Sequence, residues 1–388
     1  MKENEKIVEE ATLTYKVLRG QNKIGENLIE VSYGDTKILV ELGKALDGGE
    51  QLSDVEQAVL QVDYNAVVVS HYHADHAGLI AEKRDCPIYV GKGAYRVLGA
   101  ISEYHGAVLP SNVATYKNGK PFYVGAIKVT PFLCDHSAYD SYMLLFEAGG
   151  RSVLYTGDFR FHGRKDSGKL LCALPKKVDV LITEGTNLGK NACTITESQL
   201  ENKLVDIMRQ NDKPVFVLQS ASNIDRLVSV YRAAKRSGRI LYEDNFAALV
   251  ATAAGGSIPR PDVFPDVYAF TPRLLRGHRK DMFWKIEQKR GLKGIAAGKK
   301  FVMLVRPSML KYVEKLNGSL GLSGATLVYS TWSGYKQDEA MAQFLNQAKD
   351  MCITVVDLHT SGHASKEDLE LLEKAVNPGQ IVRVHTEA

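Results

Sequence analysis

The residues best suited to chemistry stand together in one short string, S-H-Y-H-A-D-H at positions 70–76. Imidazole and carboxylate groups are ligands of zinc, and they also bind manganese or iron. In an extended loop, His71 and His73 point to the same side and can bind one ion. Asp75 and His76 can turn to a second ion nearby. A polar loop with clustered histidines is the alternative, but four potential ligands at this density have no packing purpose.

Two later segments add further candidate ligands. The triplet D-H-S at 135–137 follows the expected strand Ile127–Phe132, and Y-T-G-D-F at 155–159 contains Asp158. In this order after H-x-H-x-D-H, the segments resemble the motifs of the metallo-β-lactamase superfamily. The resemblance implies an αββα sandwich, in which two sheets pack face to face with helices outside. It also implies that His136 completes the first metal site and that Asp158 bridges both metals.

The last part of the chain narrows the resemblance to the β-CASP nucleases. Glu184 ends an expected buried strand, S-G-H-A at 361–364 follows another, and V-H-T-E lies at 384–387. An acidic residue and two histidines in this order, with a large insertion after the first, resemble motifs A, B and C of that group. The letters around them, and A-S-N-I-D-R at 221–226, are most similar to the ribonuclease J family. The implied fold is a metallo-β-lactamase sandwich with an inserted α/β β-CASP domain.

The resemblance assigns a role to each candidate residue. Two divalent metal ions are expected, with zinc favoured and manganese as the alternative. The expected ligands are His71, His73 and His136 for one ion, Asp75, His76 and His385 for the other, and Asp158 as the bridge. His363 would face the scissile phosphate, and Glu184 would orient a ligating or catalytic histidine. Either His363 or Asp75 would pass a proton to the leaving oxygen.

Substrate contacts are expected from two places. Ser361 and the amides around Gly362 and Ala364 precede an expected helix at Lys366, and a helix N-terminus holds a phosphate well. The inserted domain is expected to contribute Ser222, Asn223 and Arg226.

The expected chemistry is phosphodiester hydrolysis. Two ions roughly 3.5–4 Å apart lower the pKa of a bridging water and clamp the attacking and leaving oxygens. The resemblance favours a two-metal ribonuclease, either a 5′-exonuclease or an endonuclease. A DNA nuclease of the same family is an alternative, because no feature of the sequence indicates recognition of a 2′-hydroxyl. A small-molecule esterase or lactonase on the same fold is a third interpretation, and a metal-bearing binding protein without activity is a fourth.

The charge of the chain is uneven. The whole sequence carries 49 Lys+Arg and 45 Asp+Glu, a net charge of +4. Between residues 185 and 330, 23 basic residues stand against 12 acidic ones, and the remainder holds 26 basic against 33 acidic. This imbalance predicts a surface that binds polyanions. The resemblance implies that the polyanion is single-stranded nucleic acid, with RNA favoured. The basic candidates are Arg226, Arg232, Lys235, Arg236, Arg273, Arg276, Arg279 and Lys280.

The expected elements divide the chain at the same places. Up to residue 184, short apolar runs and Gly-containing turns predict strands and hairpins. From 185 to 330, strands alternate with helices, which predicts a parallel sheet with helices over it. We therefore expect residues 1–184 and 331–388 to form the sandwich and 185–330 to form a cap over one edge. The catalytic cleft should lie between the two domains.

Other features bear on location and assembly. The polar N-terminal stretch is unlike a signal peptide, and no apolar run approaches the roughly 20 residues that span a bilayer. Five scattered cysteines without a C-x-x-C pair favour the cytoplasm. Glu41 stands where the family has an aspartate, a change expected to leave the metal site intact. The chain ends three residues after His385, without the further domain of ribonuclease J, and a homodimer stays open.

Overall fold

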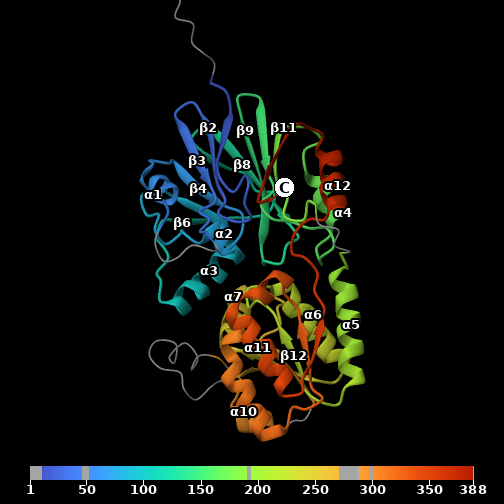
Figure 1. The fold of residues 1–388 in the computed structure, drawn as a ribbon. Helices are drawn as coiled ribbons and strands as arrows, with labels where there is room; N and C mark the ends of the chain where they lie inside the picture. The colour runs from blue at the N-terminus through green and yellow to red at the C-terminus, as the bar shows by residue number, and fades with distance from the viewer. Residues whose placement is uncertain are drawn as a thin grey trace, which may run out of the picture.

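The computed structural model describes residues 11–45, 52–189, 194–270, 286, 288–296 and 300–387. Figure 1 shows two lobes, an upper one that contains the first and the last described residues and a lower one built from the middle of the chain. Within the described residues, the strands form three sheets, two in the upper lobe and one in the lower. No helix in this part of the chain is long and apolar enough to span a membrane.

The first sheet lies in the upper lobe and runs in the order β1-β2-β3-β4-β5-β6. Its strands are β1 (Thr14–Arg19), β2 (Leu28–Tyr33), β3 (Thr36–Val40), β4 (Ala66–Val69), β5 (Ile88–Gly91) and β6 (Val113–Tyr116). The first three strands are antiparallel, and β3 to β6 pair in parallel. The S-H-Y-H-A-D-H string therefore begins at the carboxyl end of the central strand β4.

The second sheet faces the first and runs in the order β19-β11-β10-β9-β8-β7. Its strands are β7 (Phe122–Val124), β8 (Ile127–Cys134), β9 (Ser141–Ala148), β10 (Arg151–Tyr155), β11 (Val178–Glu184) and β19 (Pro378–Val384). Strands β10, β11 and β19 are parallel neighbours. Strand β8 shares their direction, because β9 is antiparallel to both β8 and β10. The carboxyl ends of these four strands therefore lie at one edge of the sheet.

The two sheets pack together because each presents an apolar face to the other. Ile29, Val40 and Val68 of the first sheet join Leu144 and Ile182 of the second in one buried cluster. Burial of this apolar surface is the main force that holds the sheets together.

Helices cover the outer faces of the sandwich. Helices α1 (Asp54–Gln61) and α3 (Lys92–His105) share a buried cluster with the outer face of the first sheet. Helices α4 (Ser167–Ala173) and α12 (Lys366–Val376) share another with the second sheet. Figure 1 shows α12 and α4 on the side of the upper lobe beyond β11. The αββα sandwich that the resemblance implied is confirmed.

The lower lobe contains a parallel sheet in the order β15-β14-β13-β16-β12-β17-β18. Its strands are β12 (Val215–Leu218), β13 (Ile240–Asp244), β14 (Val267–Phe270), β15 (Lys289–Arg290), β16 (Phe301–Val305), β17 (Thr326–Tyr329) and β18 (Thr354–Asp357). The accompanying helices are α5 (Glu197–Gln210), α6 (Ile224–Arg236), α7 (Asn245–Ala254), α9 (Leu292–Ala296), α10 (Leu310–Leu320) and α11 (Glu339–Asp350). This parallel α/β arrangement is the one that the alternating elements predicted.

The third sheet continues beyond residue 330, the position at which the excess of basic residues predicted the end of the insertion. Strand β18 pairs with β17 along its whole length, and α11 lies between them in sequence. The expected boundary is therefore too early for this sheet, because charge composition does not report strand pairing. We propose that the inserted domain runs from about residue 185 to β18, and that the chain then returns to the sandwich.

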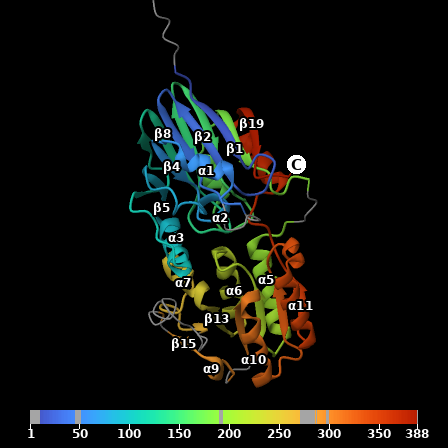
Figure 2. The same ribbon diagram turned by 60° about the vertical axis from the view of Figure 1, so that its left-hand side comes forward.

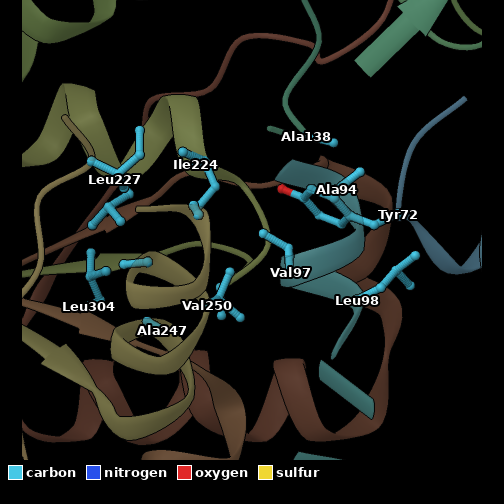
Figure 3. Packing of buried hydrophobic residues seen from close by; sticks show 14 of the residues in the cluster. Tyr72, Ala94, Val97, Leu98, Ala138, Ile224, Leu227, Ala247, Val250 and Leu304 are labelled. Carbon is cyan, nitrogen blue, oxygen red and sulfur yellow. The ribbon is translucent and has the colours of Figure 1, made fainter. Parts of the chain in front are cut away.

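The two lobes share buried apolar surface. In Figure 3, Tyr72, Val97 and Leu98 of the upper lobe lie across from Ile224 and Val250 of the lower, and all belong to one buried cluster. Figure 2 shows α3 directly above α7. The inserted lobe therefore packs against the side of the sandwich that carries the histidine string.

Two hydrogen bonds also join the lobes next to the histidine string. The hydroxyl of Tyr72 donates to the carbonyl of Ser222 at 2.8 Å, and the amide of Ile224 donates to the carbonyl of Ser137 at 3.2 Å. Each bond involves a neighbour of a candidate ligand, so the packing of the insert bears directly on the position of the site.

Candidate metal centre

All seven expected ligands gather at the edge where the strands of the sandwich end. His71 and His73 follow β4, and Asp75 and His76 lie in the short helix α2 (Ala74–Ala77). The remaining three are His136 after β8, Asp158 after β10 and His385 after β19. Because these strand ends share one edge of the sandwich, residues that are 314 positions apart in sequence meet in space.

The first ligand group consists of His71, His73 and His136. One nitrogen of each ring lies within 4.8 Å of the others. His136 Nε2 lies 3.1 Å from His73 Nδ1. Three imidazoles facing one another at this spacing form a site for one divalent ion.

The second group consists of Asp75, His76, Asp158 and His385, again within 4.8 Å of one another. His385 Nε2 lies 2.9 Å from Asp75 Oδ2, and His76 Nε2 lies 3.2 Å from Asp158 Oδ2. Asp158 Oδ2 also lies 3.9 Å from both His71 and His136 of the first group. Asp158 therefore lies between the two groups, as a bridging ligand would.

Outer contacts orient the imidazoles. Ser70 Oγ lies 3.0 Å from His71 Nδ1, and the carbonyl of Gly362 accepts from His136 Nδ1 at 2.6 Å. Thr186 Oγ1 lies 2.7 Å from His385 Nδ1. In each ring, the nitrogen that faces the cluster is left to bind an ion, which is the usual arrangement of metal-bound histidine.

Glu41 occupies an outer position against the second group. Its carboxylate accepts from the amide of Ser70 at 3.1 Å and lies 3.3 Å from His76 Nδ1. The longer side chain at this position therefore supports His76 from outside and leaves the ligand groups intact, as expected from the sequence.

Buried atoms without hydrogen-bond partners show that the cluster fits metal ions. His71 Nε2 and Asp158 Oδ1 are fully buried, and neither has a hydrogen-bond partner among the described residues. An unpartnered buried polar atom costs roughly 1–3 kcal/mol. Coordination to divalent ions would remove this cost, and nitrogen and oxygen donors of this kind bind such ions.

The pKa values divide the cluster into neutral and charged parts. Burial lowers the pKa of His71 and of His136 well below the ordinary value, and it lowers that of His73 to about 4. These three rings are therefore neutral near pH 7, the form that binds a metal. The second group is different: burial opposes charge there too, but the carboxylate of Asp158 raises the pKa of His76 well above its ordinary value.

His363 and Glu184 form an ion pair beside the second group. Glu184 Oε2 lies 3.1 Å from His363 Nδ1, and Asp158 Oδ2 lies 3.5 Å from the same nitrogen. Although burial alone would lower it, these two carboxylates raise the pKa of His363 to about 9. The structure thus brings a cationic imidazole, oriented by Glu184, to the edge of the metal-binding cluster.

Sequence reasoning missed two positioning residues close to the ligands. Thr186 Oγ1 contacts both His385 Nδ1 and His363 Nδ1, at 2.7 and 3.3 Å. Asn27 Nδ2 lies 3.2 Å from His76 Nε2 and 3.3 Å from the carbonyl of Asp75. Threonine and asparagine are common everywhere in the chain, so neither stands out without the fold.

Arg160 is a third residue that sequence reasoning missed. It is fully buried, and its guanidinium donates to Asp135 at 2.8 Å and to Asp225 of the insert at 2.7 Å. It also donates to the carbonyl of Ser361 at 2.8 Å and lies 3.3 Å from Glu197. One side chain therefore connects the loop before His136, the loop before His363 and the inserted lobe.

Arg226 was expected to contact the substrate, and this expectation is wrong. Its side chain is fully buried, and its guanidinium donates to Glu197 at 3.2 Å and to the carbonyls of Ser330 and Thr360 at 3.1 Å each. A buried arginine needs such partners, and here they leave no contact for a nucleic acid. Arg226 joins α6 to the start of α5, to the end of β17 and to the segment that returns to the sandwich.

Two of the amides before α12 already have partners within the protein. The amide of Ala364 donates to Glu184 at 3.3 Å, and that of His363 donates to Ser361 Oγ at 3.1 Å. The N-terminus of α12 is already capped by Ser365 and Asp368, whose carboxylate repels a phosphate. The role expected for Ala364 is therefore wrong, because Glu184 already occupies its amide. The contact expected from the amide of Gly362 stays a prediction, and the carbonyl of this residue accepts from His136.

The other expected substrate contacts have different outcomes. Asn223 uses its side-chain oxygen to cap α6, accepting from the amide of Arg226 at 2.9 Å. Ser222 and Ser361 are partly exposed, and their contact with substrate stays a prediction.

The basic candidates for polyanion binding also have different surroundings. Arg232 and Arg236 are exposed but lie 3.7 and 2.8 Å from Glu201. Lys235 is exposed as well, whereas Arg273, Arg276, Arg279 and Lys280 lie outside the described residues.

Comparisons with known proteins agree with this geometry. Residues 49–210 match the family model described as a beta-lactamase superfamily domain. Ribonuclease J of Sinorhizobium meliloti is 22% identical over 418 residues, which cover 98% of this chain and 70% of that protein. Ribonuclease J 1 of Streptococcus pyogenes is 22% identical, over 95% of this chain and 67% of the relative. The fold is shared with a solved protein of unknown function from Enterococcus faecalis, at a TM-score of 0.78 and 21% identity over 97% of this chain and 94% of that one.

Proposed function

We propose that this chain, a ribonuclease J-like protein of the metallo-β-lactamase superfamily, is a metal-dependent hydrolase of RNA phosphodiesters. One observation carries the proposal: seven ligand side chains and the His363–Glu184 pair converge on a single edge of the sandwich. The relatives that match nearly the whole chain are named ribonuclease J. Their names and the chemistry of the site point to the same reaction.

The two ligand groups would each hold one divalent ion. His71, His73 and His136 would bind the first, Asp75, His76 and His385 the second, and Asp158 both. Bound ions of this kind supply an activated water and positive charge beside the phosphate. Imidazoles and two carboxylates suit zinc, which we propose as the native ion, with manganese as the alternative.

We assign His363 to the transition state and not to an ion. Its cationic ring lies beside Asp158, where the negative charge of a phosphate would develop during hydrolysis. A preorganised cation at such a position stabilises the transition state. Its Nδ1 proton is held by Glu184, so the opposite side of the ring is left to face the substrate.

His363 is also the better of the two expected proton donors. Asp75 lies 2.9 Å from His385 Nε2, and although burial opposes its charge, the neighbouring histidines lower its pKa below the ordinary range. A carboxylate that stays ionised cannot release a proton to the leaving oxygen. We therefore place Asp75 among the metal ligands and the proton on His363.

A single assay tests the function. Purified protein is incubated with end-labelled single-stranded RNA or DNA that carries a 5′-monophosphate or 5′-triphosphate, with zinc or manganese, and the product ladder is followed. We expect metal-dependent cleavage of RNA; the ladder then shows whether nucleotides leave one by one from the 5′ end or internal cuts occur. Cleavage of DNA alone would support the DNA nuclease instead. Hydrolysis of a lactone or thioester with both nucleic acids left intact would support the small-molecule hydrolase.

Two finer proposals concern location and assembly. We place the protein in a reducing compartment, the cytoplasm, because Cys86, Cys134, Cys172 and Cys352 are free thiols. A homodimer is the assembly to test against a monomer, and sedimentation velocity at two protein concentrations separates the two.

A further inference from the structure

A pocket of about 670 Å³ opens beside the loop that carries His363. Its walls come from both lobes. Asn187, His359 and Ser361 line it from the segments around the sandwich, while Trp332 and Lys336 line it from the segment after β17. The pocket is therefore a feature of the assembled lobes.

The pocket adjoins the proposed catalytic residues through direct contacts. Ser361 Oγ accepts from the amide of His363 at 3.1 Å and from Asn187 Nδ2 at 3.1 Å. Asn187 Nδ2 also donates to the carbonyl of His363 at 3.2 Å. A group bound in the pocket would thus lie one short loop away from the ring that we assign to the transition state.

The charges of the pocket do not suit a phosphate. Lys336 is paired with Asp357 at 2.6 Å, and both residues line the pocket. Glu367 adds a carboxylate on the same wall, and Lys366, also on the wall, lies 3.8 Å from Glu370. Burial, together with nearby Arg226, lowers the pKa of His359 to about 4, so this ring is neutral. What the pocket offers is hydrogen-bonding groups without net charge, which matches a nucleoside better than an anion.

An exposed aromatic pair lies at the pocket, and its Trp332 is part of the wall. Trp332 directly precedes the short helix η2 (Ser333–Gln337), and Tyr335 lies on it. Their side chains are 53% and 44% exposed, although large aromatic side chains are usually well buried. Their ring centroids are 5.3 Å apart at an interplanar angle of 87°. Exposed aromatic rings next to a polar pocket are the means by which many proteins stack the bases of single strands.

Two backbone features fix the position of the Trp332 indole, a hydrogen bond to its carbonyl and the missing β-carbon of Gly334. The hydroxyl of Tyr329 donates to the carbonyl of Trp332 at 2.8 Å. The six-membered ring of Trp332 lies where a β-carbon on Gly334 would be, with ring atoms 2.2–2.5 Å from that position. A glycine is therefore needed at 334 for the indole to adopt this position, and any larger residue must displace it.

We propose that this pocket is a nucleoside subsite, in which one base of the single-stranded substrate stacks on the indole of Trp332 while its neighbouring phosphate reaches His363. The proposal rests on the proposed function and adds the part of the substrate that the ligand cluster does not recognise. It also makes Trp332 a specificity-determining residue, because a base with a larger π-face stacks more strongly.

The test measures binding through the fluorescence of Trp332. The chain has two tryptophans, so Trp284→Phe leaves Trp332 as the only reporter. The probe is a ten-residue oligoadenylate RNA with phosphorothioate linkages, together with a series in which each position in turn is abasic. We expect the full oligomer to quench the fluorescence, and one abasic position to abolish most of the quenching and weaken binding roughly 10-fold, the size of one stacking contact.

Variants supply a readout that does not depend on fluorescence. In a filter-binding assay with labelled oligomer, Trp332→Ala and Gly334→Ala should both weaken binding roughly 10-fold, the first by removing the indole and the second by displacing it. Trp332→Phe should restore part of the affinity. The matched control is Tyr123→Ala on β7, which removes a tyrosine that is 65% exposed and should leave binding unchanged.

The outcomes separate this subsite from the proposed function. If the wild-type protein cleaves RNA but Trp332→Ala binds the oligomer as tightly as wild type, the subsite is wrong and the function stands. Equal affinity for every abasic oligomer has the same meaning. If the wild-type protein neither binds nor cleaves RNA in the presence of metal, both proposals fail.

Discussion

The ligand cluster and the interface between the lobes are both buried and polar, yet they differ in one respect. At the cluster, His71 Nε2 and Asp158 Oδ1 have no hydrogen-bond partner among the described residues. At the interface, the guanidinium groups of Arg160 and Arg226 contact carboxylates and carbonyls on several sides. Buried polar groups are normally paired. Unpaired imidazole and carboxylate atoms that face one another within the cluster fit a metal ion, whereas the paired guanidinium groups have a structural role.

The largest effect should follow removal of the bridging ligand. Asp158→Asn takes away the charge that both ligand groups share, so we expect metal content to fall below one ion per chain and RNA cleavage to drop beyond detection. Elemental analysis after gel filtration measures the first and the end-labelled assay the second. Loss of an outer partner of a metal ligand already costs about 10–100-fold in affinity or activity.

Asp179→Asn is the matched control for this variant. Asp179 accepts from the amide of Ser152 at 2.8 Å, away from the cluster, and its replacement should leave the metal content unchanged. Retention of two ions by Asp158→Asn would contradict the bridging role and with it the contrast between the two regions.

Variants at the interface between the lobes should lower the free energy of unfolding. Arg160→Met leaves Asp135, Asp225 and Glu197 without their shared cation, and breaking a buried ion pair costs about 3–5 kcal/mol. Urea unfolding measures the free energy of unfolding. Arg226→Met provides the comparison: we expect a similar loss of stability, but a smaller loss of kcat, because Arg226 does not hold the carbonyl of Ser361. Equal kcat in both variants would show that Arg160 has no positioning role.

A smaller effect is expected from replacing His363, which we assign to the transition state. His363→Ala should keep both ions and lower kcat about 10²–10³-fold, the usual cost of one group that stabilises developing charge. Metal analysis and single-turnover kinetics on the same preparation test both statements. His105→Ala, an exposed histidine at the end of α3, should cleave RNA at the wild-type rate. A near-normal rate in the His363 variant would remove this residue from the mechanism.

Acidification should weaken the interface in a defined pH window. Burial alone would raise the pKa of Glu197, but Arg226 and Arg160 lower it to about 2, from an ordinary value of 4.5. A group with a lowered folded pKa stabilises the protein fully above its unfolded pKa and loses this contribution as the pH falls through the folded one. The stability difference between wild type and Glu197→Gln should therefore be largest above pH 4.5 and shrink towards pH 2. A constant difference across this range would contradict the charged pairing.

The smallest effect should come from exposed charge on α6. Each basic residue that neutralises a phosphate contributes about 0.7 to the slope of log K against log salt for a single strand. Arg232 is already close to Glu201, so the double variant Arg232→Ser, Lys235→Ser should flatten the slope by no more than about 1.4. Lys311→Ser, Lys315→Ser on α10, at the bottom of the lower lobe in Figure 1, is the matched control. An equal change in both double variants would show that net charge, and not the face of α6, determines binding.

Some parts of this molecule follow from local sequence alone. The strand before His71 is a continuous apolar run, and the helix at Glu197 begins with Thr196 and Gln199, whose side chains bond reciprocally to each other's amides at 3.1 and 2.8 Å. An apolar run and a capping box indicate backbone geometry directly, because each depends only on neighbouring residues. The candidate metal ligands were also identifiable, because histidine and aspartate at such density have few other uses.

Tertiary structure alone decided which polar side chains are available to a ligand. The charge balance counted Arg226 and Arg232 alike as basic candidates, yet the first is fully buried and the second exposed, because they lie on different faces of α6. Strand pairing likewise placed β18 with the inserted sheet, beyond the boundary that charge suggested. Availability depends on what the rest of the chain places around a side chain. The sequence determined which groups can do chemistry, and long-range packing determined which of them are left free to do it.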